Sequence, residues 1–511
     1  MIAPRIRFFF VLFALSTVVL RAESSPESDF AVLTFNVENL FDVDGVALFD
    51  DYAMETVEPG NVPYSAALLG KKLDFIVRTV AAINDGEGPE VILFQELERD
   101  QTPDTTLPGV EEFLATFEEM SLAEMLEKSD LPEIRGLPSY AFLIKALAEE
   151  GLSYPYVALA ESGGDPGELP AHINAVFSRF PIRGAESFPT LMAREVLVVE
   201  LDVEGCPFTV INNHWKSGAS NPETEGIRIE NAKTVRRILD RLLADDPQAD
   251  ILVGGDLNSY YDQIVLFPEM GETGINSILG SQGQEQALLE GEADLYNLWF
   301  ELPQADRFTE TWRDRKGTLM HMLVTPGLYD GRGIDYVDHS FRVVTLPGLN
   351  IDEWGRPQRF RFAGGGRGGS DHLPILARFV VAGENGTPQA DLLEPGREAD
   401  QPGKLLYVNY SLDRDGAPTP LPMNALFSLP EENWSTELGK LYEVEGRLEG
   451  IDPLMLDTGE HRMEVYCTTK ASWQKINRVR GSGEVRFFAE LGMWDGNFQW
   501  VVRDPGWIPQ Q

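Results

Sequence analysis

The sequence contains very little cysteine, and this scarcity excludes two classes of protein. Cys206 and Cys467 are the only cysteines among 511 residues. A small disulfide-stapled scaffold and a thiolate metal cluster both need more cysteines at short spacing, so neither fits this chain. A single bridge between the two residues stays open.

Positive charge is also in short supply. Lys and Arg number 42 against 82 Asp and Glu, which gives a formal net charge of −40. A chain this acidic repels a polyanion unless metal ions or a local basic patch intervene. Tight, nonspecific coating of nucleic acid is therefore excluded, and any contact with nucleic acid is expected to be transient.

Long apolar runs are absent beyond the N-terminus. There, two arginines precede the apolar stretch 8–20, and small residues follow it. This order predicts a signal peptide over 1–22; an uncleaved anchor is the alternative, because Leu20 and Arg21 make an imperfect cleavage site. No later segment is apolar enough to cross a bilayer, so we expect a mature chain without a transmembrane segment, secreted or periplasmic.

Composition and patterning predict two globular domains. The hydrophobic content of 43% and charged content of 24% are typical of a globular protein. Strand-like and helical stretches alternate over 28–381, which predicts an α/β catalytic domain with an acidic helical insertion at 103–150. Gly, Pro and acids dominate 382–403, a predicted linker. Apolar and polar positions alternate over 404–511, which predicts a small all-β domain, either an OB-like barrel or a sandwich.

Short β-rich runs bounded by polar turns mark the expected strands of the first domain. They lie at 30–36, 90–96, 174–178, 194–203, 208–215, 250–258, 318–325, 336–344 and 373–381. Apolar residues at helical spacing predict helices over 68–81 and around 225–243.

Acids, amides and histidines gather at the ends of five of these strands. They are Asn36, Glu38 and Asn39; Glu96 and Glu98; Asn212, His214 and Lys216; Asp256 and Asn258; and Asp371 and His372. Strand ends hold side chains rigidly while the adjoining loops vary. Carboxylates and amide oxygens without cysteine suit a hard cation, Mg²⁺ first and Mn²⁺ or Ca²⁺ as alternatives. The chemistry indicated is transfer of a phosphoryl group to water.

The order of these five clusters resembles the endonuclease/exonuclease/phosphatase family over about residues 30–381, in its deoxyribonuclease-like, secreted bacterial form. The resemblance implies a four-layer α/β sandwich, two packed mixed sheets flanked by helices, with a divalent metal at one edge. It implies metal ligands at Asn36, Glu96 and Asp371, catalytic residues at His214, Asp256, Asn258 and His372, and substrate-binding residues at Asn212, Asn174 and Lys216.

The resemblance also implies how the catalytic residues act. Asp256 positions or deprotonates the attacking water, and Asn258 orients that water or the phosphate. His372 polarises or protonates a phosphate oxygen or serves as the base, while His214 hydrogen-bonds the scissile phosphate or the leaving oxygen. Asn174 and Lys216 have plain structural alternatives, a strand end and a solvated surface cation.

The chain departs from the family pattern at one position. Family members usually carry an aspartate that orients the histidine of the Ser-Asp-His motif, and the matching residue here is Met320. A thioether is a weak acceptor, so the tautomer and basicity of His372 are left open. Asp335 and Asp338 are the alternative partners.

The function predicted is a secreted, divalent-metal-dependent phosphodiesterase, most simply an extracellular endonuclease acting on DNA or RNA. Hydrolysis of a phospholipid or another small phosphoester by the same fold is one alternative. A catalytically degenerate binding protein, with Met320 as the first sign of decay, is the other. Aromatic residues of the last domain either stack on bases or fill its core; they are Trp473, Trp494, Phe498 and Trp500. Nothing in the sequence specifies an oligomeric state.

Overall fold

The computed structural model describes most of the chain. Its described residues are 29–44, 46, 64–100, 109–160, 170–312, 315–353, 355–361, 368–382, 410–414, 416–451, 453–494 and 497–509. The predicted signal peptide and all of the predicted linker except residue 382 lie outside them. The predicted fold class, an α/β sandwich followed by a small all-β domain, is confirmed.

The first mixed sheet is built around a buried parallel pair, β1 (Asp29–Leu40) and β2 (Val91–Glu98). Its other pairings are antiparallel. The order runs β13 (Ile334–Tyr336), β15 (Ile375–Val381), β1, β2, β4 (His172–Ser178) and β3 (Tyr156–Leu159), with β14 (Arg342–Val343) also paired to β15.

The second mixed sheet has the same plan. Its parallel pair is β7 (Cys206–His214) and β8 (Ile251–Asp256). The order runs β5 (Ile182–Phe188), β6 (Val196–Val203), β7, β8, β12 (Met320–Val324) and β9 (Tyr296–Asn297). Both parallel pairs therefore end near polar residues that the sequence analysis identified as candidate site residues.

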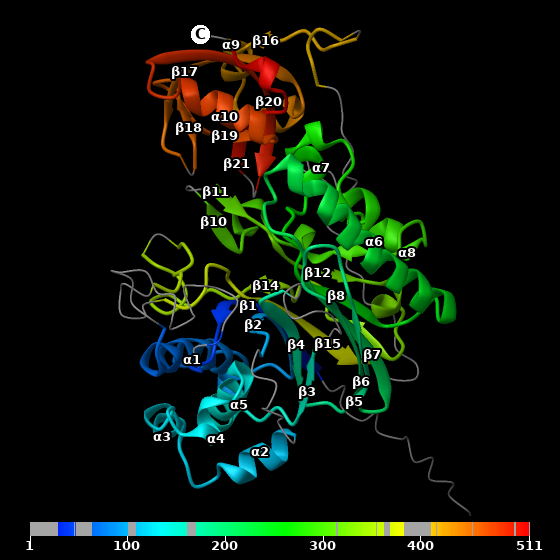
Figure 1. Ribbon diagram of the computed structural model, residues 1–511. Helices are drawn as coiled ribbons and strands as arrows, with labels where there is room; N and C mark the ends of the chain where they lie inside the picture. The colour runs from blue at the N-terminus through cyan, green and yellow to red at the C-terminus, as the bar shows by residue number, and fades with distance from the viewer. Residues whose placement is uncertain are drawn as a thin grey trace, which may run out of the picture.

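The two sheets pack face to face between helices, giving four layers (Figure 1). Helices α1 (Ala66–Ala81) and α5 (Ser139–Glu149) bury apolar residues against the first sheet. Helix α6 (Pro222–Asp245) buries its apolar stripe against the outer face of the second. Alternate residues of β6 face opposite ways, Leu197 into the space between the sheets and Val198 toward α6, as the pleat requires.

The predicted acidic insertion is helical. It contains α2 (Val110–Thr116), α3 (Leu122–Glu127), α4 (Pro132–Arg135) and α5. Its last helix lies against α1 and β2 with buried Phe142 and Leu143, so this part of the insertion belongs to the hydrophobic core.

One expected strand is wrong, and one hairpin was not predicted. The run 336–344 is divided between β13 and β14, with a turn at His339, whose φ of 59° no strand permits. A hairpin of β10 (Glu310–Trp312) and β11 (Arg315–Gly317) was not expected, because three-residue strands carry too few residues to show a period.

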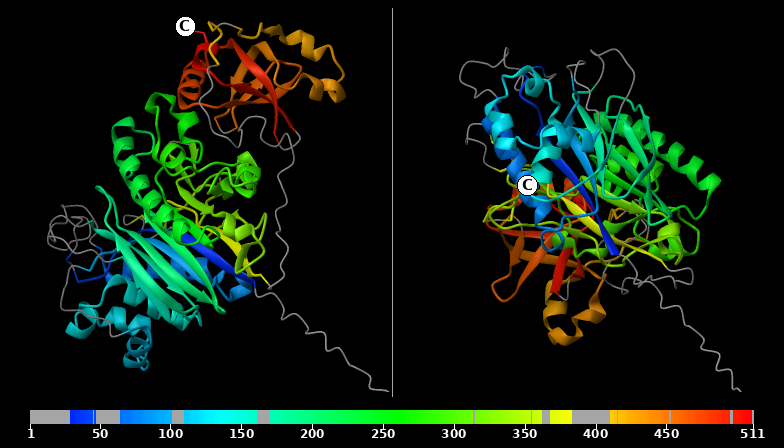
Figure 2. Two further views of the ribbon diagram at one scale, coloured as in Figure 1. Left: turned by 90° about the vertical axis from the view of Figure 1, so that its right-hand side faces the viewer. Right: turned by 90° about the horizontal axis from the view of Figure 1, so that it is seen from below.

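The C-terminal domain is a closed barrel. It runs β17 (Leu441–Glu449), β18 (Met455–Asp457), β19 (Arg462–Cys467), β21 (Asn497–Val502) and β20 (Glu484–Trp494), and β20 pairs back to β17. Helix α10 (Lys470–Val479) links β19 to β20, and β19 and β21 are parallel. This arrangement is OB-like and excludes the sandwich alternative. Figure 2 shows the barrel, in orange and red, at one end of the molecule.

Two of the four aromatic residues singled out in the sequence pack inside the barrel domain. Trp500 is fully buried in the core, and Phe498 packs edge-on against Trp434. Trp473 is only partly buried, and the side chain of Trp494 lies outside the described residues. Both cysteines are free, so the possible bridge does not form.

Among the described residues, no helix combines the length and the apolar content that crossing a bilayer requires.

Candidate active site

Irregular backbone at the ends of β1 and β2 shapes the site. Glu38, Asn39 and Glu96 all have positive φ, between 50° and 64°, and the pairing of β1 with β2 shifts register there. Such conformations are unfavourable for side chains with a Cβ and persist only where other contacts enforce them. One such contact is the Asn39 N–H, which donates to Glu96 Oε2 at 3.0 Å. The bulges therefore aim the Glu96 carboxylate at the sheet edge.

Two carboxylates from different sheets meet at Asn36. Its Nδ2 donates to Glu96 Oε1 at 3.1 Å and to Asp256 Oδ2 at 3.0 Å. Burial raises the pKa of Asp256, and the Asn258 N–H, donating to Oδ1 at 2.9 Å, works against that rise. The Asn36 Oδ1 accepts the Glu38 N–H at 2.9 Å. Asn36 thus bridges the acids through its nitrogen, and its role as a metal ligand stays a prediction.

His214 completes a group of potential metal ligands. Its Nε2 lies 3.7 Å from Glu96 Oε1 and 3.6 Å from Asp256 Oδ2. Burial, reinforced by the charge of Arg194, holds the pKa of His214 well below its usual value, so the imidazole is neutral and can offer a lone pair. One ligand atom from each of these three residues lies within 4.8 Å of the others. Two carboxylates and an imidazole fit a divalent cation.

The Ser-Asp-His segment reaches this group through close backbone packing. An added Cβ at Gly369 would lie 1.8 Å from the Phe75 ring, so only glycine fits there. Ser370 Oγ donates to Asn36 O at 2.7 Å and accepts the His372 N–H at 3.1 Å. These two hydrogen bonds therefore fix His372 against β1. Residues 362–367, which precede this segment, lie outside the described ranges.

His372 stands among four acids. Its Nε2 lies 3.7 Å from both Asp256 Oδ2 and Asp371 Oδ1, and its Nδ1 lies 3.9 Å from Glu310 Oε2. Burial alone would lower the pKa of His372, but Asp371, Asp256, Glu310 and Glu96 together outweigh it and raise the pKa to about 9. The imidazole is therefore a proton donor at neutral pH.

Glu310, which the sequence did not reveal, is the acid facing His372 Nδ1. Its Oε2 accepts from Thr309 Oγ1 at 2.6 Å and from the Leu319 N–H at 3.2 Å, and burial raises the pKa of Glu310 to about 7. Met320 pairs with Asp256 across β8 and β12, with its side chain in the core. The missing aspartate is thus matched by a glutamate on the unexpected β10–β11 hairpin.

The two alternative partners of His372 make their recorded contacts elsewhere. Asp335 Oδ1 accepts the Gly331 N–H at 3.0 Å. Asp338 lies with Glu301 and His339 in a second group of potential ligands.

Replacing Glu310 by Gln should change the pH dependence of activity. The substitution removes one of the charges that raise the pKa of His372, so the pH–rate limb reporting this imidazole should move by about one unit to lower pH. The measurement is kcat/KM against pH for a phosphodiester substrate. Asp306→Asn, at an exposed acid just before the hairpin, is the control. An unchanged limb would show that Glu310 does not act on His372.

The remaining predicted residues divide into two groups. Asn258 lies at the site, its N–H on Asp256 and its Nδ2 on Trp215 O at 3.1 Å. The side-chain amide of Asn212 is hydrogen-bonded inside the protein. Its Nδ2 donates to Phe94 O and Ala175 O, and its Oδ1 accepts from Gln95.

Asn174 and Lys216 stand outside the ligand group. Asn174 is buried and donates to Glu195 O at 2.8 Å. Lys216 is partly exposed, and its N–H donates to Asn231 Oδ1. The structure therefore does not join Asn212, Asn174 or Lys216 to the ligand group, and their substrate-binding roles stay predictions.

Two arginines add positive charge beside the acids. Arg359 Nη2 lies 2.9 Å from Glu38 Oε1 and 3.3 Å from Asp371 Oδ2, and its side chain is 55% exposed. Arg194 Nη2 donates toward His172 Nδ1 at 3.3 Å from a partly buried position. Arg359 comes from an irregular segment far from any predicted strand end, so no sequence signal pointed to it.

A buried lysine ties the Ser-Asp-His segment to β1. Lys72 Nζ donates to Glu38 O and, at 2.6 Å, to Gly369 O, and the side chain is fully buried. Burial lowers the pKa of Lys72 to about 8. The unfolded chain therefore holds this proton up to higher pH than the folded one.

This shift predicts a stability difference that depends on pH. The free energy of unfolding of the wild type, measured relative to Lys72→Met, should rise by up to ~3 kcal/mol between pH 8 and 10.5, because the unfolded state binds more protons in that window. Urea titrations of both proteins at several pH values provide the test. A difference that stays constant or falls with pH contradicts the buried-lysine account.

A family model matches part of this chain. Residues 178–380 match the model of the Endonuclease/Exonuclease/phosphatase family. This segment contains His214, Asp256 and His372, and over these residues the match confirms the resemblance indicated by the motifs. Members of that family are hydrolases of phosphoesters. A search of curated proteins finds no match.

Solved structures were compared as well. A truncated Caenorhabditis elegans TDP2 is 13% identical and covers 69% of this chain and 98% of its own, with a TM-score of 0.36. A Bacteroides thetaiotaomicron endonuclease/exonuclease/phosphatase family protein is 13% identical over 72% and 100%, TM-score 0.38. Sphingomyelinase C from Streptomyces griseocarneus is 16% identical over 69% and 99%, TM-score 0.36. What these proteins act on is not carried over to this chain.

Proposed function

We propose that this chain is a secreted, divalent-metal-dependent phosphodiesterase, most simply an extracellular endonuclease that hydrolyses DNA or RNA. The observation that supports it most is the meeting of Glu96, His214 and Asp256 from both sheets, with His372 Nε2 3.7 Å from Asp256 Oδ2. The match of residues 178–380 to a family of phosphoester hydrolases supports the same chemistry.

Glu96, His214 and Asp256 are the proposed holders of the metal, Mg²⁺ first and Mn²⁺ or Ca²⁺ as alternatives. Asn36 keeps the two acids together, and Asp371, whose Oδ1 lies 3.7 Å from His372 Nε2, is a further candidate ligand. A divalent cation held here would supply positive charge against the phosphate oxygens.

The surrounding residues would position and protonate the reactants. His372, charged at neutral pH, is suited to donate a hydrogen bond or a proton to a phosphate oxygen or the leaving group. Asp256 presents Oδ2 to the ligand group while Asn258 holds its Oδ1, so the carboxylate keeps a fixed orientation toward an attacking water. Arg359, more than half exposed, lies where it can meet a substrate phosphate.

The degenerate-protein alternative is weakened by Glu310. Met320 counted as a sign of decay because it left His372 without an acid partner. Glu310 supplies a buried carboxylate on the same imidazole from another strand. The hypothesis of an active enzyme therefore still has an acid partner for His372.

Removing the metal should abolish activity, and comparing several substrates should identify the class of phosphodiester that the protein hydrolyses best. The purified mature chain is assayed with Mg²⁺ and with excess EDTA on single-stranded DNA, duplex DNA, RNA and sphingomyelin. We expect EDTA to remove cleavage and Mg²⁺ to restore it, with a nucleic acid the best substrate. Cleavage that persists in EDTA argues against metal dependence, and a clear preference for sphingomyelin selects the phospholipid alternative.

A further inference from the structure

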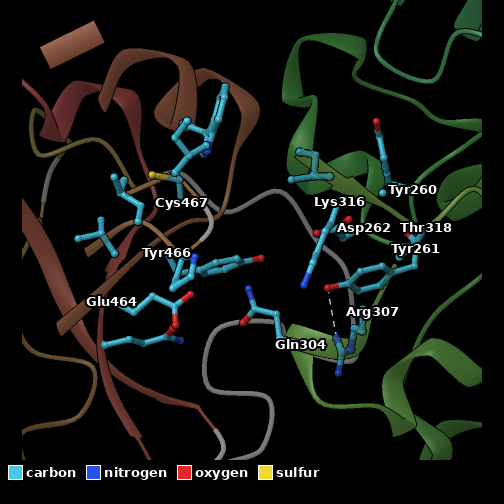
Figure 3. Close-up of a pocket in the computed structure, with 18 residues that line it drawn as sticks. Tyr260, Tyr261, Asp262, Gln304, Arg307, Lys316, Thr318, Glu464, Tyr466 and Cys467 are labelled. Atoms are coloured by element: carbon cyan, nitrogen blue, oxygen red, sulfur yellow. Dashed lines mark hydrogen bonds between the residues drawn. The ribbon is translucent and has the colours of Figure 1, made fainter. Parts of the chain in front are cut away.

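A cleft of about 350 Å³ lies between the catalytic domain and the C-terminal barrel (Figure 3). One wall comes from the segment after β8 and from the β10–β11 hairpin, and the other from β19, β21 and α10. Lys470 of α10 joins the walls at one side: its Nζ donates to Ser220 O at 3.3 Å and lies 5.1 Å from the centre of the Phe267 ring. The cleft therefore belongs to both domains.

The barrel contributes a surface that OB-like folds use for binding. The cleft is lined by four successive residues of β19, 464–467, and by the connection around Pro453 that leads into β18. These are the third strand of the barrel and the loop between its first and second strands, which belong to the surface where such barrels bind oligonucleotides or oligosaccharides. The chemistry of the side chains that line the cleft indicates which of these two classes of ligand it binds.

The cleft adjoins the candidate active site. An added Cβ at Gly317, which lines the cleft, would lie 1.9 Å from Glu310 Oε1 and 2.6 Å from Tyr260 Cε1. Glu310 in turn faces His372. Tyr260 follows Asn258 by two residues and also lines the cleft. Glu310 therefore lies against the cleft residue Gly317 on one side and against His372 on the other.

Two amides in the cleft have unmet hydrogen-bonding capacity. Within the described part of the chain, Gln499 Nε2 and Gln304 Oε1 are buried and have no hydrogen-bond partner, and Gln499 is only 3% exposed. Leaving such groups unpaired is unfavourable, so they favour a ligand that pairs with them. One presents a donor and the other an acceptor, from opposite walls, and the edge of a nucleobase carries both.

Aromatic and cationic side chains complete the lining. Tyr466 projects from β19 across the cleft toward Gln304 and Lys316 (Figure 3). Trp473 of α10, partly buried, lines the same wall. Flat rings accept bases of any sequence by stacking, and an ammonium group attracts the adjoining phosphate.

We propose that the interdomain cleft binds a nucleobase of a single-stranded nucleic acid whose scissile phosphate lies beside Glu96, His214 and Asp256. The proposal rests on the proposed function and narrows its substrate from phosphodiesters in general to single strands. A paired base hides its Watson–Crick edge and one stacking face, whereas a base in a single strand offers both to the cleft. A net charge of −40 also favours a ligand held by stacking over one held by many phosphate contacts.

Catalysis provides the first test. Tyr466→Ala and Tyr466→Phe are compared with wild type on a single-stranded oligonucleotide and on an aryl phosphodiester too small to reach the cleft. We expect Tyr466→Ala to lower kcat/KM for the oligonucleotide about 5- to 100-fold, Tyr466→Phe to retain most of it, and both to leave the aryl substrate unchanged. Tyr156→Ala, an exposed tyrosine of edge strand β3, is the matched control.

Binding provides a second test that needs no catalysis. Fluorescence anisotropy of a labelled oligonucleotide is measured in the His372→Ala background, with and without Tyr466→Ala, for single and double strands. Tighter binding of the single strand, weakened by Tyr466→Ala, supports the cleft even if no cleavage is found and the proposed function fails. Equal binding with and without Tyr466→Ala, no binding, a preference for duplex, or equal loss on the aryl substrate overturns the proposal while leaving the proposed function to its own test.

Discussion

Glu96→Gln should lower kcat/KM for phosphodiester hydrolysis by about 10³-fold at a fixed Mg²⁺ concentration, the largest effect we expect from one side chain. The substitution keeps the size of the side chain and removes its charge. Glu96 Oε1 is the oxygen that faces both His214 Nε2 and Asn36 Nδ2, so the lost charge lies at the centre of the ligand group. Metal affinity should fall with activity.

The experiment measures rate as a function of Mg²⁺ concentration, with metal binding followed separately by calorimetry. Glu87→Gln changes an exposed glutamate just before β2 and serves as the matched control. If saturating Mg²⁺ gave Glu96→Gln the wild-type rate and the wild-type metal affinity, Glu96 would not be a ligand.

His372→Ala should have nearly as large an effect on rate and the opposite effect on metal binding. Losing a positioned proton donor typically costs about 10²- to 10⁴-fold, and we expect kcat to fall in that range. The charged imidazole also lies 3.7 Å from Asp256 Oδ2, where it repels a cation. Its removal should therefore leave Mg²⁺ affinity unchanged or tighter.

This pairing of results separates the two residues. Glu96→Gln should lose metal and rate together, while His372→Ala loses rate alone. Added imidazole should restore part of the His372→Ala rate and none of the Glu96→Gln rate. Loss of Mg²⁺ affinity in His372→Ala would contradict the account, because it would make His372 a ligand or a support of the metal site.

The parts of the fold that the sequence predicted are those with strong local patterns. β1, β2, β7 and β8 are buried apolar runs that end in polar residues, and both signals are visible without neighbours. The candidate site residues on these strands could be proposed from the sequence for the same reason. Choosing a barrel over a sandwich required the β17–β20 pairing, a contact between distant segments that alternation cannot show.

The parts that were missed depend on tertiary contacts. Glu310 lies on a three-residue strand, and only the fold brings it to His372. Lys72 looks like a solvent-facing residue of an amphipathic helix, yet its ammonium group is buried on two backbone carbonyls. The hydrogen bond between Asn212 and Gln95, which joins the two sheets, was also not visible in the sequence. Residue type and order along the chain do not show any of these three contacts.

The central claim is that this chain hydrolyses phosphodiesters with a metal held by Glu96, His214 and Asp256. The most direct test is the initial rate on an aryl phosphodiester in Mg²⁺ and in EDTA, for the wild type and for Asp256→Asn, which keeps the shape of the side chain. We predict hydrolysis by the wild type in Mg²⁺ only, and a rate at least about 10²-fold lower for Asp256→Asn. Equal rates for the two proteins, or no hydrolysis by the wild type above the EDTA control, would contradict the claim.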